Sequence, residues 1–376
     1  MVSEILETPI VSLLIAAFFS YVIVRITIPA IIRVASEKHL MEEPNGRSSH
    51  LQKTPSLGGI AIFAAIVITF LLATPESITR EVNIHLVIPS LVILFFIGLK
   101  DDILVIDPYK KLLAQLLAAA LAIFFTDIRI SNLYGILGLY EISYLSSFVI
   151  TLFVMIVVIN AYNLIDGIDG LAAGLGIVAS LTFGVYFFVA EVYWAAALSS
   201  VLVSALLAFV RFNFSKKNKI FMGDSGSLVV GFILSLLAIK FIQFNQIFNE
   251  HYVPNAPTIA ILILAIPLFD TLRVFTHRIA SGSGPFVADR NHIHHFVIDN
   301  GLSHLSATVL LSFLSITVVS IGGYFFTESS VSYSFTGLIV TFILYSLIVR
   351  RDVLVKKPFV DEKLLGKKSR SAVGQS

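Results

Sequence analysis

The stretch NAYNLIDGIDGLAAGLG, Asn160 to Gly176, joins two long apolar runs and decides what kind of molecule the chain can form. Two asparagines and two aspartates stand three residues apart at the end of one run, where charge is normally excluded. Buried acids at membrane depth are unfavourable unless they serve a purpose, so they predict a functional site in a membrane protein.

Composition places the chain in a lipid bilayer. Apolar residues make up 57% of the 376 and charged residues 13%, whereas soluble domains have roughly 45–50% and about 25%. The mean hydropathy of +0.91 agrees with this placement. The absence of cysteine excludes disulfides and thiolate metal sites. The first residues carry Glu4 and Glu7 rather than a basic patch, so we expect no cleavable signal peptide.

The predicted fold is an all-α, polytopic membrane helix bundle of about 11 spans, since a spanning helix needs about 20 mostly apolar residues. The expected spans are roughly 9–31, 57–74, 84–100, 110–126, 142–160, 168–190, 192–210, 225–245, 258–275, 304–326 and 335–350. We expect one catalytic membrane domain over residues 1–350, followed by a basic, disordered cytoplasmic tail over residues 351–376.

Orientation follows from the distribution of Lys and Arg, which favour cytoplasmic loops. Of the 26 basic residues, 22 fall in alternate connections, and most connections on the other side are acidic. The basic connections are 32–56, 100–111, 211–223, 273–303 and the tail from residue 350. The amino terminus is therefore predicted outside and the carboxyl terminus in the cytoplasm.

All unusual polar clusters fall on the predicted cytoplasmic side. They are GRSSHLQKTPSLGG (46–59), GLKDDILVIDPYKK (98–111), the opening motif, FNFSKKNKIFMGDSGS (212–227) and FDTLRVFTHRIASGSGPFVADRNHIHH (269–295). Because the predicted outer connections hold nothing comparable, these five clusters together indicate one site at the inner end of the bundle.

Two of these clusters are rich in acids. Adjacent Asp101 and Asp102 repel each other unless a cation or donor lies between them, so the pair indicates either a metal or proton-transfer role or a solvated helix end. In the opening motif, a helix or tightened 3₁₀ turn would line up Asn160, Asn163 and the two aspartates along one stripe. A polar loop explains their residue types but not their regular spacing.

The last two clusters suit phosphate. Small residues around Asp224 leave backbone amides accessible at a helix start, which favours anions, although Asp224 also fits an ordinary cap. In RNHIHH, zinc is one interpretation, but an Arg with several imidazoles fits a phosphate clamp better. Enzymes that transfer phosphoryl groups use carboxylates that bind Mg²⁺ together with cationic side chains that bind phosphate. The other histidines, His39, His85, His251, His277 and His304, are expected to be bystanders.

In this order, TPSLGG, KDD, NAYNLIDGIDGLAAG, FMGDSGS and DRNHIHH resemble the polyprenyl-phosphate N-acetylhexosamine-1-phosphate transferases of glycosyltransferase family 4 over nearly the whole chain. The resemblance implies transfer of a sugar-1-phosphate from a UDP-N-acetylhexosamine to undecaprenyl phosphate, with release of UMP. It implies Mg²⁺, with Mn²⁺ as a substitute, a multi-pass protein of the bacterial plasma membrane with a cytoplasmic active site, and no nucleic-acid partner. It leaves room for a homodimer.

The resemblance also implies residue roles. Asp224 and Asn163 would hold the metal, Asp101 and Asp102 would lie at the prenyl phosphate, and Asp166 and Asp169 would organise the site. The substrate-binding residues implied are Lys53, Asn160, Phe221 (stacking on uracil), Arg290, His292, His294 and His295. Because the acceptor phosphate is largely dianionic at neutral pH, a general base gains little, and direct in-line attack is expected rather than a phospho-aspartate intermediate.

Within the family, the chain is most similar to the GlcNAc-1-phosphate transferases that begin the synthesis of O-antigen (part of lipopolysaccharide), enterobacterial common antigen or wall teichoic acid. The phospho-MurNAc-pentapeptide transferases of cell-wall synthesis share the Asp motifs but carry an unbroken triple histidine, whereas this chain has HIHH. Outside the family, an ion-coupled secondary transporter and a zinc-dependent intramembrane hydrolase are the alternatives. Transporter sites lie near the midplane between repeated halves, which these acids do not match.

Overall fold

The computed structural model describes residues 8–41, 53–73, 84–136, 138–246, 250–282, 292–326, 334, 336–343 and 345–346. The helices are α2 (Pro9–Glu37), α3 (Gly58–Ala73), the 3₁₀ helix η1 (Ile84–Val87), α5 (Ile88–Ile103), α6 (Pro108–Thr126), α7 (Tyr144–Ile165), α8 (Leu171–Val189), α9 (Tyr193–Asn213), α10 (Gly223–Phe244), α11 (Ala256–Ile263), α12 (Ala265–Ala280), α13 (Ile293–Asp299) and α14 (His304–Phe326). Strands β1 (Asn132–Ile136) and β2 (Leu139–Glu141) form an antiparallel hairpin.

The chain is an all-α, polytopic membrane helix bundle. Within the described residues, eight helices are long and apolar enough to cross a membrane, or nine if α11 and α12 form one broken span. The apolar helix α3 is shorter, and the predicted eleventh span (335–350) is only partly described. The count and the orientation of the spans therefore stay predictions.

The chain forms two compact units, residues 1–338 and residues 339–376. All helices and strands with bounds above belong to the first unit. The predicted boundary at residue 350 and the tail that follows it lie outside the described residues.

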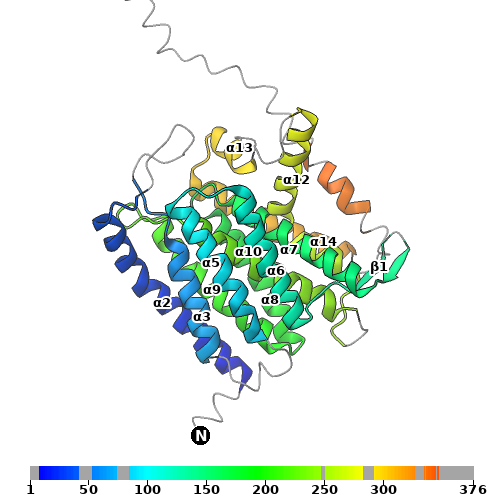
Figure 1. Cartoon of the computed structure of the whole chain (residues 1–376). Helices are drawn as coiled ribbons and strands as arrows, with labels where there is room; N and C mark the ends of the chain where they lie inside the picture. Colours follow the sequence, from blue (N-terminus) through cyan, green and yellow to red (C-terminus); the bar gives the residue numbers. More distant parts are fainter. Residues whose placement is uncertain are drawn as a thin grey trace, which may run out of the picture. The chain divides into compact units, whose positions relative to one another are not determined.

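The predicted span over 258–275 is not one continuous helix, because α11 and α12 meet at Leu264 with an angle of 82°. Proline has no N–H, so Pro267 cannot donate the helical hydrogen bond to the carbonyl four residues earlier, at the end of α11. The break lets α12 run in a different direction, and Figure 1 shows α12 and α13 projecting at one end of the bundle.

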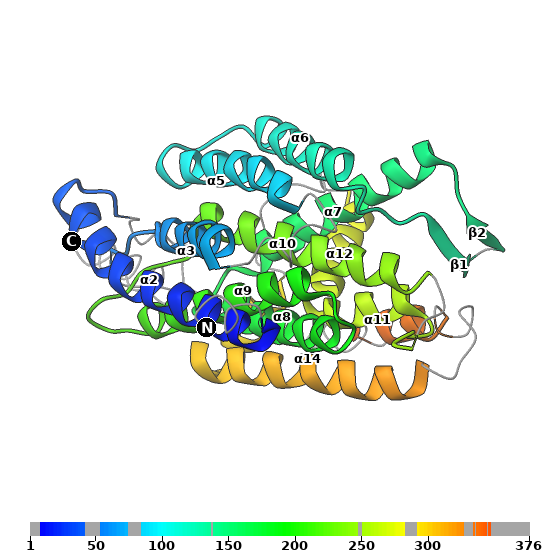
Figure 2. The ribbon, with the colours of Figure 1, turned by 90° about the horizontal axis from the view of Figure 1, so that it is seen from below.

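Helix α10 forms the centre of the bundle. Its sequence is apolar on all sides, as expected of a fully surrounded helix, and nearly all of its side chains are buried. It packs against α3, α5, α7, α8 and α11. In Figure 2, α5 and α6 lie on one side of α10 and α14 lies on the opposite side.

Close backbone approach fixes the start of α10. A Cβ atom on Gly98 of α5 would lie 2.6 Å from the Cα of Ser225, and one on Gly59 would lie 2.2 Å from the amide nitrogen of Gly226. The amides of Gly58 and Gly59 also donate to the carbonyls of Phe221 and Met222, over 2.9 and 2.8 Å. The TPSLGG and FMGDSGS motifs are therefore paired through their backbones.

We predict that Gly98→Ala lowers the thermal unfolding midpoint in detergent. The added methyl group meets backbone atoms that cannot rotate away, and overpacking costs about 1–3 kcal/mol, against a helix-propensity gain of about 1 kcal/mol. Gly323→Ala on α14 is the matched control, because no atom lies within 4 Å of its Cβ position. Equal midpoints for the two variants would contradict the packing argument.

Candidate active site

A cavity of about 710 Å³ lies where α5, α7 and α10 end or begin. Eight of the predicted site residues line it: Asp101, Asp102, Asn163, Asp166, Asp169, Phe221, Asp224 and His295. They come from four separate sequence clusters, so the helix ends bring together motifs that lie more than 190 residues apart in the chain. His39, Leu40 and Met41, which follow α2, also line the cavity.

Three side-chain oxygens from three helices converge on one cation, the ammonium group of Lys111 on α6. It contacts Oδ2 of Asp101 and Oδ1 of Asn163, each at 3.1 Å, and it is also paired with Oδ2 of Asp224. The amide of Asn163 donates to Oδ1 of Asp224 over 2.7 Å. Lys111 was not predicted as a site residue, although its cluster was. It offsets carboxylates that would otherwise repel each other at the membrane end.

Asp102 has a different position from its neighbour. Its two oxygens accept hydrogen bonds from the backbone amides of Asp224 and Ser225, over 2.6 and 3.0 Å, and from the hydroxyl of Ser225 over 2.6 Å. The group that accepts hydrogen bonds at the start of α10 is therefore the carboxyl group of Asp102 itself, at a position where a helix N-terminus favours negative charge. The predicted catalytic role of Asp102 is not tested by this contact, but any such role has to coexist with this cap.

The predicted helical stripe in the opening motif is wrong beyond Ile165. Helix α7 ends there, and Asp166 and Asp169 lie in the turn that leads to α8. Asn160, one helical turn before Asn163, does not line the cavity but exchanges hydrogen bonds with the amide of Gln115 on α6.

Asp169 is buried among partners from distant segments. Its Oδ2 accepts from the ammonium of Lys219 at 2.6 Å and lies 2.9 Å from Nδ1 of His304, and its carbonyl accepts from the hydroxyl of Thr308. His304, which the sequence analysis expected to be a bystander, therefore contacts a predicted site residue. Neither Lys219 nor His304 has a spacing that links it to Asp169 in the sequence.

The histidine cluster is held by Asp270 on α12, which was not predicted as a site residue. Its carboxylate contacts Nδ1 of His292 at 2.8 Å, accepts from the backbone amide of Ile293 and pairs with the guanidinium of Arg273. This arrangement orders the start of α13. His292 and His294 are buried and stack on each other, whereas His295 lines the cavity. Arg290 lies outside the described residues.

The ring of His294 lies directly against the turn after α7. A Cβ atom on Gly167 would be 2.1 Å from Nε2 of His294, so only glycine permits this contact. Burial lowers the pKa of His294 to about 3, and the neighbouring His295 adds to the shift. The imidazole is therefore neutral at physiological pH.

Two predicted substrate residues have contrasting positions. Lys53 is exposed and is not among the residues that line the cavity. Phe221 lines the cavity, and the ammonium of Lys219 lies 5.4 Å from the centroid of its ring.

A metal ion at the cavity would need several oxygen ligands close together. In the described part of the chain, no group of three or more His, Asp or Glu side chains is arranged to hold a metal. The oxygens of Asp101, Asn163 and Asp224 nevertheless already surround one cation, Lys111. Hard carboxylate and amide oxygens of this kind suit Mg²⁺.

Comparison with known proteins identifies the relatives of the chain. Residues 84–242 match the family model described as "Glycosyl transferase family 4". The chain is 30% identical, over 77% of each sequence, to the undecaprenyl-phosphate alpha-N-acetylglucosaminyl 1-phosphate transferase of Escherichia coli. It is 28% identical, over 93% of each, to a probable undecaprenyl-phosphate N-acetylglucosaminyl 1-phosphate transferase of Bacillus subtilis. It is 33% identical to the decaprenyl-phosphate N-acetylglucosaminephosphotransferase of Mycolicibacterium smegmatis, over 74% of this chain and 73% of the relative.

We predict that Asp102→Asn lowers the free energy of unfolding by about 1–3 kcal/mol, because a neutral amide cannot accept three hydrogen bonds at a helix start as a carboxylate does. Thermal unfolding in detergent measures the loss. Asp107→Asn is the control, because Asp107 caps the exposed start of α6 and Asn caps almost as well as Asp. A variant as stable as this control would show that the cap contributes little.

We predict that His294 does not titrate between pH 5 and 8. Its folded pKa lies below the unfolded value of 6.5, so the unfolded state binds more protons, and the contribution of His294 to stability is complete above pH 6.5 and declines as pH falls toward 3. Imidazole NMR resonances assigned with His294→Gln measure the protonation directly. A midpoint near pH 6 would contradict the burial argument.

Proposed function

The chain belongs to glycosyl transferase family 4, and from this premise we propose its reaction. It transfers an N-acetylhexosamine-1-phosphate from a UDP-sugar to undecaprenyl phosphate. The sugar is N-acetylglucosamine in this proposal, because the relatives above are named for it. The products are UMP and a lipid-linked pyrophosphoryl sugar, the starting unit of a cell-envelope polysaccharide. The single observation that supports this chemistry best is the convergence of Asp101, Asn163 and Asp224 on one cation beside the cavity.

The metal in this proposal is Mg²⁺, with Mn²⁺ as a substitute. Asp224 and Asn163 would hold it together with Asp101, since their oxygens already converge. When bound, it would supply positive charge to the phosphates of the two substrates, which the acids of the cavity otherwise repel. Lys111 shares these oxygens, so its ammonium has to move aside or remain as a second cation.

The residues of the chain would act mainly by positioning and by charge, which is what phosphoryl transfer demands of a protein. An oxygen of the lipid phosphate attacks the phosphorus that bears the sugar, a new P–O bond forms, and the P–O bond to the departing UMP breaks. Lys111 would offset negative charge on the phosphates, and Phe221 would contact the uracil. Asp169 would hold Lys219 and the turn that carries Asp166, and His295 would contact the nucleotide sugar together with Arg290.

The proposed location is the cytoplasmic face of a bacterial plasma membrane. The relatives named above are bacterial, UDP-sugars are cytosolic, and the phosphate of a prenyl lipid lies at the headgroup plane. A cavity at the ends of the membrane helices meets both substrates, whereas a transporter site would be expected near the midplane.

The test uses the purified full chain with undecaprenyl phosphate, Mg²⁺ and a panel of UDP-N-acetylhexosamines. We expect UMP release and lipid-linked product with UDP-N-acetylglucosamine, and a loss of roughly 100-fold or more in Asp224→Asn and Asp101→Asn, because each removes charge from the proposed cation site. Asp107→Asn, exposed and outside the cavity, should retain activity.

Omitting one component at a time decides the remaining points. Without the lipid, direct attack releases no UMP, whereas a burst equal to the enzyme concentration would indicate a phosphoryl-aspartate intermediate. Zinc should not replace magnesium. Absence of lipid product with every UDP-sugar, from a protein that retains its unfolding midpoint, would overturn the proposed function.

A further inference from the structure

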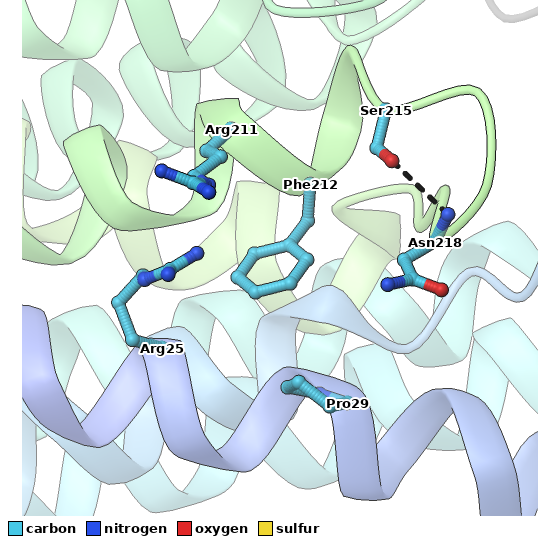
Figure 3. A pocket seen from close by; sticks show the side chains of 6 residues that line it. All are labelled: Arg25, Pro29, Arg211, Phe212, Ser215 and Asn218. Atoms are coloured by element: carbon cyan, nitrogen blue, oxygen red, sulfur yellow. Dashed lines mark hydrogen bonds between the residues drawn. The ribbon is translucent and has the colours of Figure 1, made fainter.

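A second cavity lies between α2 and the end of α9, apart from the candidate active site. It has a volume of about 340 Å³ and is lined by Arg25, Pro29, Arg211, Phe212, Ser215 and Asn218. Figure 3 shows the two arginines on one side of the Phe212 ring and the polar pair Ser215 and Asn218 on the other. None of these six residues lines the larger cavity.

Among the residues that the structure describes, no acid pairs with the positive charge at this cavity. Arg25 lies within a predicted span, and its guanidinium is 5.2 Å from the centroid of the Phe212 ring. Neither Arg25 nor Arg211 forms an ion pair with a carboxylate of the described residues. Two guanidinium groups that line one small cavity repel each other, and a charged residue within a membrane span usually has a functional reason.

Two of the remaining lining residues, Ser215 and Asn218, have side chains that can accept or donate hydrogen bonds. The hydroxyl of Ser215 accepts from the backbone amide of Asn218 over 3.0 Å, which holds the turn after α9 in a closed form. Guanidinium groups bind phosphate oxygens in a planar fork, and Ser and Asn side chains complete such sites. The volume is at the small end of the range for ligand sites, which suits a phosphate group and its immediate neighbours rather than a nucleotide sugar.

We propose that this cavity binds a phosphate group, and that the group belongs to an anionic membrane phospholipid. Helix α2 presents lipid-facing side chains next to the cavity: Ile26, adjacent to Arg25, is 70% exposed, and Pro29 of the lining is exposed as well. Arg211 lies two residues before Asn213, which lines the active-site cavity, so the phosphate would bind at the level where the membrane helices end.

The segment after Arg211 connects the two cavities. Phe212 lines the second cavity, and the side-chain amide of the next residue, Asn213, donates to the backbone carbonyl of Ile220 over 2.8 Å. Lys219 in the same segment pairs with Asp169. A phosphate held by Arg211 and Ser215 would therefore order a segment that also supports the active site, and we expect slower amide hydrogen exchange over residues 214–219 when it is bound.

The test compares the full chain with two variants that lose the same net charge. R25Q/R211Q removes both arginines of the cavity. R33Q/K216Q removes two exposed basic residues from the same two segments, outside the cavity. Native mass spectrometry in detergent at about 150 mM salt, which screens diffuse surface attraction, counts bound phosphatidylglycerol and gives its affinity. Thermal unfolding and hydrogen exchange are measured on the same samples.

We expect one tightly bound phosphatidylglycerol per wild-type chain. R25Q/R211Q should bind it at least roughly tenfold more weakly, since two charge-assisted contacts are lost, and R33Q/K216Q should stay within about twofold of wild type. If R25Q/R211Q does not fold, R211Q alone, at the exposed end of α9, should show a smaller loss in the same direction. Equal losses in the two double variants, or unchanged binding in both, would overturn the proposal.

The source of the phosphate is decided with soluble probes. Millimolar inorganic phosphate and glycerol phosphate should neither displace phosphatidylglycerol nor raise the unfolding midpoint. If they do both, and R25Q/R211Q loses the effect, the phosphate site is supported and its ligand is a solute instead of a lipid. Phosphatidylcholine serves as the zwitterionic comparison, and binding as tight as that of phosphatidylglycerol would overturn the requirement for an anionic lipid.

Discussion

The structure depends on one ion cluster, in which the ammonium of Lys111 is shared by oxygens of Asp101, Asn163 and Asp224. These residues lie on α6, α5, α7 and α10, so the cluster joins the ends of four helices. Carboxylates at this depth are tolerated only with a cation or several donors nearby. Two carboxylates share this single ammonium, and the proposed function places a further cation beside them.

The two aspartates of the KDD motif are adjacent in sequence but have different partners in the structure. Asp101 contacts Lys111 and accepts from the backbone amide of Ile106 over 2.8 Å, so it belongs to the cation cluster and to the end of α5. Asp102, one residue later, points to another face of the helix and caps α10. Because consecutive residues on a helix point in directions about 100° apart, the two adjacent side chains contact different parts of the structure. The central helix α10 thus begins on a carboxylate that α5 supplies.

Much of the fold could be predicted, because a bilayer requires long apolar helices, and the gathering of the motifs at one end of the bundle followed from their side of the membrane. Pairings set by tertiary packing could not be predicted. Asp270 contacts His292, 22 residues later, and His304 contacts Asp169, 135 residues earlier, with no local spacing to indicate either contact. The stripe of Asn and Asp failed at Ile165 because the three-residue spacing also suits a turn, and Gly167 and Gly170 favour the turn.

A recognisable motif can act through its backbone as well as through its side chains. Pro55 accepts a hydrogen bond from the amide of Phe221, and Gly58 donates to the carbonyl of Phe221, so TPSLGG serves as a backbone partner of the segment that enters α10. These two bonds hold both the N–H and the C=O of Phe221, while its ring remains at the cavity. The residue types of TPSLGG are then required by close approach, since side chains on Gly58 or Gly59 would collide with this segment.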